Sequence, residues 1–156
     1  MGELANIFRS AALNNLELLK KDIENCSDDV WEKKFGTDYY WHHVMHAIGS
    51  ANFFLGLLGV QGLPTPPEGL QLNLYQEADA AFLHSRETAL TYLAETTAFL
   101  EGYFEKLDDK LLLTPADFFG QKTTYGGILA FYAAHLAYHL GACDIVLREN
   151  GLQGAL

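Results

Sequence analysis

The chain has 156 residues and a formal net charge of -10, from 20 acidic and 10 basic side chains, and 49% of its residues are hydrophobic. This composition excludes a disordered chain, and it argues against nucleic acid as a partner, because nucleic-acid binding depends on Lys and Arg side chains that neutralise phosphates. At this length we expect a single domain over residues 1–156, with enough buried surface to fold without disulfides.

Four long helical segments are predicted. The first runs from about Gly2 to Asn25, where apolar residues recur at helical spacing. The second begins near Thr37 or Asp38, both good N-caps, and continues to about Leu58, where Gly59 ends it. Its core face is expected to carry Tyr39, His42 or His43, His46, Gly49, Phe53 and Leu57.

A long connection follows the second helix. Its stretch GLPTPPEGLQLNLY holds three prolines and two glycines, which rule out a continuous helix. The third helix is predicted between about Gln76 and Leu107, with Ser85 capping its main part after a short helical turn from Tyr75 to Leu83. Beyond it, the Phe118–Phe119 pair and the threonines that follow could form an extended piece.

The fourth helix is predicted to begin near Thr123 or Thr124 and to end at Asn150, with Gly151 as the residue that stops it. Four long helices joined by one long connection indicate an all-α fold. We therefore expect a four-helix bundle with a long crossover between helices 2 and 3.

Three features bear on the location of the protein. Cys26 and Cys143 match neither a zinc motif nor a dense disulfide pattern, so we expect free thiols, with one bridge between them as the alternative. The first ten residues lack the pattern of a signal peptide. The stretch from 128 to 147 has the length of a membrane span, but it carries two histidines and an aspartate, which are costly in hydrocarbon. A cytoplasmic protein without a membrane span is expected.

Five of the six histidines fall on the second and fourth predicted helices. His135 and His139 are one turn apart, so they share a face, and that face continues through Ile128 and Val146 into the core. Such a pair can chelate a metal ion. The spacing alone is weak evidence, because two core histidines with satisfied hydrogen bonds would give the same pattern.

The second predicted helix adds His42, His43 and His46 within five residues. Three ligands from two facing helices leave an open position on an ion, which is typical of catalytic metal sites. Neither cluster contains a carboxylate, and this argues against a ferritin-like di-iron centre. We expect a divalent transition metal (Zn, Ni or Fe). His84, the sixth histidine, is expected on the surface.

The stretch WHHVMHAIGSANFFL, followed far downstream by HLAYHLGACDIVLRENGL, resembles the DinB/YfiT-like superfamily over most of the chain. The pattern HxxxHxGxxxxxLRxxG in the last helix is the more specific part. The resemblance implies a four-helix bundle with a pocket at one end and a metal held by three histidines. Matched residue by residue, these ligands are His46, His135 and His139. His42, one turn before His46, is the rival, and His43 points about a hundred degrees away from His42.

The chain departs from the family after its last histidine. Where Arg-Gly-Gln is usual, this sequence has Leu140, Gly141 and Ala142. The glycine is expected to allow close helix packing. The missing Arg and Gln remove polar groups that could anchor a substrate, so activity of the family's kind is less strongly predicted than metal binding.

Three hypotheses for function follow. The resemblance implies a metal-dependent enzyme acting on a small molecule, either an S-transferase that uses a low-molecular-weight thiol or a hydrolase. The alternatives are a non-catalytic metal- or small-ligand-binding bundle and a purely structural bundle. No catalytic base is identified, although Tyr39, Tyr132 and His42 are candidates. A homodimer is expected, because a small bundle of this apolar content can leave a helix face for a partner.

Overall fold

The computed structural model of the chain describes residues 2–74 and 82–156. These ranges contain four long helices, α1 (Glu3–Asn25), α3 (Tyr40–Leu57), α4 (Arg86–Glu105) and α6 (Tyr125–Glu149). They also contain two one-turn helices, α2 (Asp28–Trp31) and α5 (Asp109–Leu112). The short strands are β1 (Lys34–Phe35), β2 (Asp38–Tyr39), β3 (Pro115–Phe118) and β4 (Gln121–Thr124). The fold is mostly helical, as predicted.

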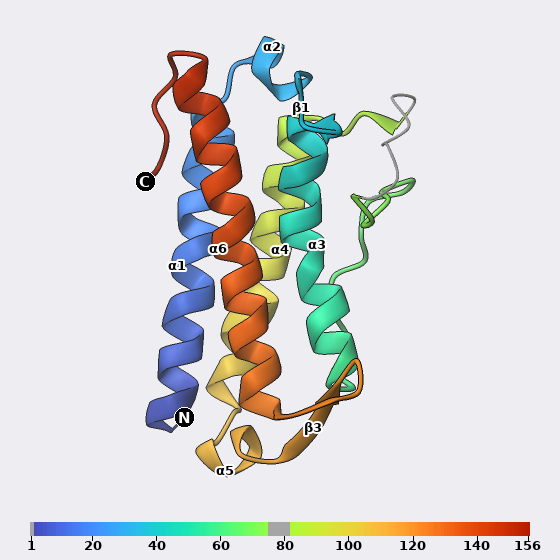
Figure 1. The fold of residues 1–156 in the computed structure, drawn as a ribbon, viewed down its shortest axis with the longest axis vertical. Helices are drawn as coiled ribbons and strands as arrows, with labels where there is room; N and C mark the ends of the chain where they lie inside the picture. Colours follow the sequence, from blue (N-terminus) through green and yellow to red (C-terminus); the bar gives the residue numbers. More distant parts are fainter. Residues whose placement is uncertain (1, 75–81) are drawn as a thin grey trace.

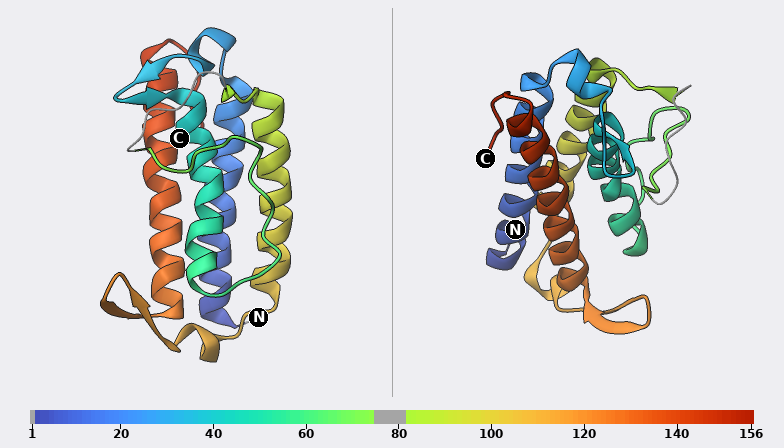
Figure 2. Two further views of the ribbon diagram at one scale, coloured as in Figure 1. Left: turned by 90° about the vertical axis from the view of Figure 1, so that its right-hand side faces the viewer. Right: turned by 45° about the horizontal axis from the view of Figure 1, so that its top comes forward.

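The four long helices run side by side (Figure 1). Helix α6 packs against α1 and α3, and α4 packs against the same two helices from the other side (Figure 2). Apolar faces of all four helices meet in the centre. Fully buried side chains there include Leu16, Ile23, Met45, Ile48, Leu100 and Tyr132. This arrangement brings α3 and α6, the two histidine-bearing helices, into direct contact.

Two helix starts and one helix end have the predicted chemistry. The Ser85 hydroxyl accepts a hydrogen bond from the backbone N–H of Thr88, and the Thr124 hydroxyl accepts one from Gly127. Gly151 ends α6 with a φ of 75°, which glycine adopts without strain. The helical turn predicted from Tyr75 to Leu83 falls largely on residues 75–81, outside the described residues.

Helix α3 differs from its prediction in two ways. It begins at Tyr40, and Asp38 lies instead in β2, which pairs antiparallel with β1. The predicted core face was also wrong at its C-terminal end, because Phe53 and Leu57 are 45% and 46% exposed, whereas His42 and Gly49 are buried as expected. The first turns of α3 are buried on nearly every side, since neighbouring helices cover one side and the connection to α4 covers another. Such a helix has no single apolar stripe.

The extended piece expected near residue 120 is a hairpin. Strands β3 and β4 pair antiparallel with Phe118 opposite Gln121, so that Phe119 and Gly120 form the two-residue turn. Both have positive φ, 52° and 81°, as the tight turns of such hairpins require. The Asp117 carboxylate accepts a hydrogen bond from the Gly120 N–H and so supports the turn.

Two smaller predictions were wrong. His84 is 9% exposed rather than on the surface, because its ring lies against Trp41 with centroids 5.6 Å apart, and its backbone carbonyl accepts the indole N–H of Trp31 at 2.8 Å. Gly141 does not mark close helix packing, since a Cβ there would meet no atom within 4 Å. Cys26 and Cys143 are both buried free cysteines, as expected.

One helix in the described part of the chain, α6, is long and apolar enough to cross a membrane by length and composition alone. The core helix of a soluble protein meets the same criteria, and much of α6 is buried against α1 and α3.

Candidate metal centre

Three histidine rings meet between α3 and α6. His46 comes from α3, and His135 and His139 come from successive turns of α6. One ring nitrogen from each lies within 4.8 Å of the other two, and the Nε2 atoms of His46 and His135 are 2.9 Å apart. No other group of three potential ligands lies this close together among residues 2–74 and 82–156. The structure thus brings the three predicted residues together, while their binding of an ion stays a prediction.

The ring of His46 is fixed by the connection between α3 and α4. Its Nδ1 lies 2.5 Å from the carbonyl oxygen of Leu72. A carbonyl can only accept, so Nδ1 carries the hydrogen and Nε2 keeps its lone pair. That lone pair is the one on the side of His135. A metal-binding histidine is usually oriented by this kind of outer hydrogen bond.

The rival ligand, His42, lies outside the cluster. Its Nδ1 is 2.6 Å from Oδ2 of Asp38, and its Nε2 is 2.5 Å from the carbonyl oxygen of Gln71. Both ring nitrogens are therefore committed to protein partners. Neither has a lone pair left for an ion, so His46 rather than His42 is the α3 member of the site.

His43 also lies outside the cluster, as its position on the helix predicted. Its ring stacks on Phe35 with centroids 4.1 Å apart, and its centroid is 6.1 Å from that of His139. Neither nitrogen has a hydrogen-bond partner within the described structure. Burial lowers the pKa of His43 below its usual value, so the ring is a neutral neighbour of the site.

The environment keeps the three imidazoles neutral. Burial, reinforced by His46, lowers the pKa of His135 to about 4, and burial, reinforced by His46 and His135, lowers that of His139 to about 3. Burial lowers the pKa of His46 as well, against the opposing effect of its bond to Leu72. Neutral imidazole is the form that binds metals, so at neutral pH the cluster needs no change of charge to receive a cation.

The aromatic residues of α3 and α6 differ in their relation to the cluster. Trp41 and Tyr132 are core residues, and Tyr138 stands edge-on to His139 with its ring largely exposed. Among the described residues, the ring nearest to His135 outside the cluster belongs to Phe54, with centroids 5.3 Å apart. Leu140, in the position of the family's usual Arg, is buried in the core. The second departure, Ala142, offers no polar group either.

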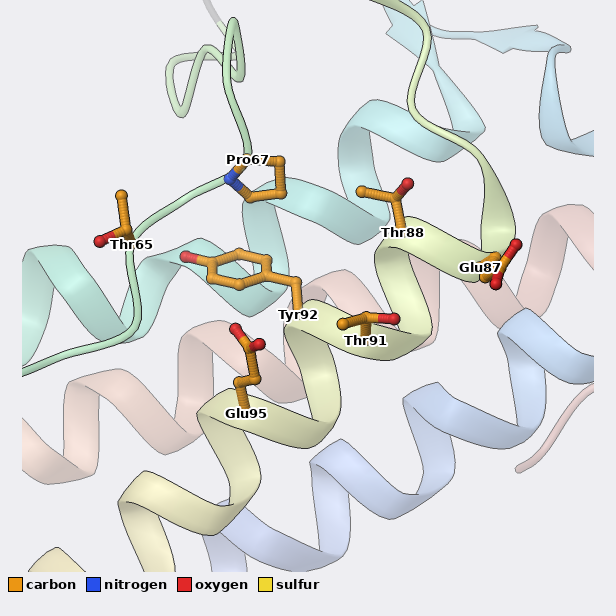
Figure 3. Close-up of a pocket in the computed structure, with 7 residues that line it drawn as sticks. All are labelled: Thr65, Pro67, Glu87, Thr88, Thr91, Tyr92 and Glu95. Carbon is orange, nitrogen blue, oxygen red and sulfur yellow. The ribbon is translucent and has the colours of Figure 1, made fainter.

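A separate depression of about 410 Å³ lies between α4 and the connection that precedes it (Figure 3). It is lined by Thr65, Pro67, Glu87, Thr88, Thr91, Tyr92 and Glu95. None of the histidines takes part in it, and no residue of α6 does. Its shape therefore says nothing about the chemistry of the histidine cluster.

The helical fold and the histidine cluster define a class of small helical proteins with a potential metal centre. The sequence profile of the DinB superfamily matches residues 17–143, a range that includes all three histidines. The chain belongs to the DinB superfamily.

The fold agrees with this membership. The structure is similar to a DinB-like protein from Bacillus cereus ATCC 10987, with a TM-score of 0.69 and 20% sequence identity over 89% of this chain and 87% of the other. No curated protein is significantly similar in sequence.

Proposed function

We propose that His46, His135 and His139 hold one divalent transition metal ion (Zn, Ni or Fe) in a four-helix bundle with a crossover between its second and third helices. The observation that carries the proposal is the convergence of three neutral imidazoles with His46 already turned so that its free lone pair faces the cluster. Two imidazoles on one helix and one on its neighbour suit an ion that keeps an open position.

Such an ion, when bound, would lower the pKa of a coordinated water or bind a thiol as its thiolate. Membership in the DinB superfamily favours a metal-dependent enzyme, either an S-transferase that uses a low-molecular-weight thiol or a hydrolase. The chain's own residues would hold the ion and exclude water from one side through Phe54. They supply no evident general base: His42 has no free nitrogen, and burial raises the pKa of the Tyr132 hydroxyl.

A non-catalytic metal- or small-ligand-binding protein is the second candidate. It is favoured by Leu140 and Ala142, which replace the polar residues usual in the family with side chains that cannot anchor a substrate. The two candidates share the metal site and differ only in turnover.

We also propose that the protein is cytoplasmic, with α6 as a core helix rather than a membrane span. The support is the buried His139 and Asp144 on α6 and the two free cysteines. A homodimer is proposed from the exposed aromatic rings of Phe53 and Phe119, which stack on each other at one end of α3. Sedimentation at micromolar concentration tests the dimer, and a single monomeric species contradicts it.

The decisive experiment is metal analysis of protein purified without a histidine tag, followed by turnover assays. One equivalent of Zn, Ni or Fe per chain supports the metal site. Consumption of an electrophile that depends on added cysteine, glutathione or bacillithiol then supports the transferase, and metal-dependent ester or amide hydrolysis supports the hydrolase. Bound metal without turnover favours the second candidate, and protein without metal that also binds none when it is added contradicts both.

A further inference from the structure

We propose that Asp38 and His42 act as a clamp that holds the segment Gln71–Leu72 against α3 and thereby sets the orientation of His46. Both are positioning residues, since neither belongs to the cluster itself. The proposal rests on the proposed function in one respect: it takes His46 as a metal ligand.

The clamp is a chain of hydrogen bonds from β2 through α3 to the crossover. Oδ2 of Asp38 lies 2.6 Å from Nδ1 of His42, and Oδ1 accepts the backbone N–H of Tyr39 at 2.8 Å. The opposite nitrogen of His42 donates to the carbonyl oxygen of Gln71. Thus Asp38 fixes the ring of His42, and that ring fixes the backbone of the crossover at residue 71.

Burial makes this chain hard to replace with water. The side chains of Asp38 and His42 are both 0% exposed. The carbonyl of Gln71 can only accept, so Nε2 of His42 carries a hydrogen, while Nδ1 is hydrogen-bonded to the Asp38 carboxyl group. Breaking a buried pair of this kind leaves one polar group unsatisfied, which is strongly unfavourable.

The next residue of the crossover is the one that orients His46. The carbonyl of Leu72 accepts the Nδ1 hydrogen of His46, and the Leu72 side chain lies over Gly49. A Cβ on Gly49 would come within 2.2 Å of a methyl carbon of Leu72, so the close approach depends on glycine. His42, His46 and Gly49 are at positions i, i+4 and i+7 of α3 and therefore share one face. The crossover is held along that whole face.

Release of residue 71 should therefore release residue 72. Without the Leu72 carbonyl, the His46 ring can adopt either tautomer and rotate, so that its lone pair no longer faces His135. Loss of a hydrogen bond that orients a ligand typically weakens metal binding by ~10–100-fold.

Two substitutions of His42 separate the two arms of the clamp. The amide nitrogen of Asn can take the place of Nδ1, and that of Gln can take the place of Nε2. His42→Asn therefore keeps a donor toward Asp38 and loses the bond to Gln71, whereas His42→Gln keeps a donor toward Gln71. The control is His84→Asn, which removes a buried imidazole outside the cluster whose Nε2 has no hydrogen-bond partner in the described structure.

A second route perturbs the crossover without touching His42. Gly49→Ala pushes on Leu72 directly, while Gly56→Ala on the same helix adds a Cβ that meets no atom within 4 Å. This pair remains informative if His42→Asn fails to fold.

Two measurements are made on each variant. The first is the dissociation constant for Zn²⁺ by competition with a chromogenic chelator. The second is the tautomer of His46 in metal-free protein, from the nitrogen chemical shifts of its ring. Substitution of a residue that only supports the fold would change neither the Zn²⁺ dissociation constant nor the His46 tautomer at temperatures well below unfolding.

We expect His42→Asn to weaken Zn²⁺ binding ~10–100-fold and to shift His46 from the Nδ1–H form toward a mixture, with partial recovery in His42→Gln and no change in His84→Asn. Gly49→Ala should weaken binding relative to Gly56→Ala. An unchanged His46 tautomer in His42→Asn overturns the proposal. If the wild type binds no metal and the tautomer still shifts, the clamp stands and the proposed function falls.

Discussion

His46 and His135 are 89 positions apart in the chain, yet their Nε2 atoms are 2.9 Å apart between α3 and α6. His46 carries its hydrogen on Nδ1, because that atom donates to Leu72. The hydrogen between the two Nε2 atoms therefore belongs to His135. This hydrogen lies between the two rings, so ligation through Nε2 of His135 would require that ring to take its Nδ1–H tautomer, with no change in net charge.

Removal of one ligand tests the cluster directly. His139→Ala is expected to reduce bound metal from about one equivalent per chain to a small fraction and to abolish the metal-dependent part of thermal stability. Helical content should remain, because the apolar faces of α6 are unchanged. Metal analysis, circular dichroism and melting curves with and without chelator measure the three effects. His84→Ala serves as the control, and retention of full metal binding by His139→Ala contradicts the assignment.

Metal binding should persist to lower pH than the ordinary pKa of histidine suggests. Protons compete with the ion for the imidazole nitrogens. Since burial lowers the pKa of His135 to about 4 and that of His139 to about 3, this competition should become strong only well below pH 6.5. Equilibrium dialysis across pH 4 to 7 measures it. A steep loss of affinity between pH 7 and 6 would show that the rings are not shielded in this way.

The same shifts predict the stability of the metal-free protein. The unfolded chain takes up protons on these histidines near pH 6.5, whereas the folded chain does so only near pH 3 to 4. The histidine contribution to the free energy of unfolding is therefore fully present above pH 6.5 and declines as pH falls toward about 4. Denaturant melts in the presence of chelator at pH 7 and pH 5 measure the decline. His135→Gln should reduce its slope.

The helices and the three histidines could be predicted because their signals are local. Ser85, Thr124 and Gly151 act within one turn of a helix end, and the spacing of His135 and His139 places them on one face without any knowledge of the rest of the fold. The choice of His46 over His42 needed the family resemblance, since both lie on the same face of α3.

The partners of those histidines could not be predicted, because they depend on where the connection between α3 and α4 lies. Gln71 and Leu72 contribute backbone carbonyls, which any residue type possesses, so their side chains give no signal. Asp38 gave a misleading sequence signal, since an aspartate just before a helix is also typical of an N-cap. Its spacing of four from His42 was the available clue to a pair. The crowding of Leu72 on Gly49 likewise follows from tertiary contact alone.

The hairpin turn stores strain that a substitution should relieve. Phe119 has a φ of 52°, where side chains other than Asn, Asp and Gly are disfavoured, and it is 77% exposed. Phe119→Asn is expected to stabilise the protein by about 0.5–1 kcal/mol, less the loss of stacking on Phe53. Phe118→Ala is the contrasting variant. Phe118 stacks on both Phe54 and Phe131, so its removal should destabilise the protein. Urea melts compare them, and destabilisation by both contradicts the role given to strain.

Asp22 on α1 and Asp144 on α6 are both buried, and removal of their charges should change the free energy of unfolding in opposite directions. Oδ1 of Asp22 accepts the N–H of Ala155, but Oδ2 has no hydrogen-bond partner in the described structure. Both oxygens of Asp144 are satisfied, by the N–H of Leu156 and by the guanidinium of Arg148 at 2.6 Å. Asp22 thus carries a buried charge that is only half compensated.

Burial raises the pKa of Asp22 from 3.8 to about 6. Between pH 6 and 3.8 the folded state binds more protons than the unfolded state, so this group favours folding as pH falls and opposes it above pH 6. Asp22→Asn should therefore stabilise the protein at pH 7 by about 1 kcal/mol, after allowance for the unpaired amide, and the gain should vanish near pH 4. Asp144→Asn should instead destabilise it by about 1 kcal/mol at pH 7, because it removes a partner from Arg148. Urea melts at pH 4, 5.5 and 7 test both, and equal destabilisation by the two variants at pH 7 would mean that Oδ2 of Asp22 is compensated after all.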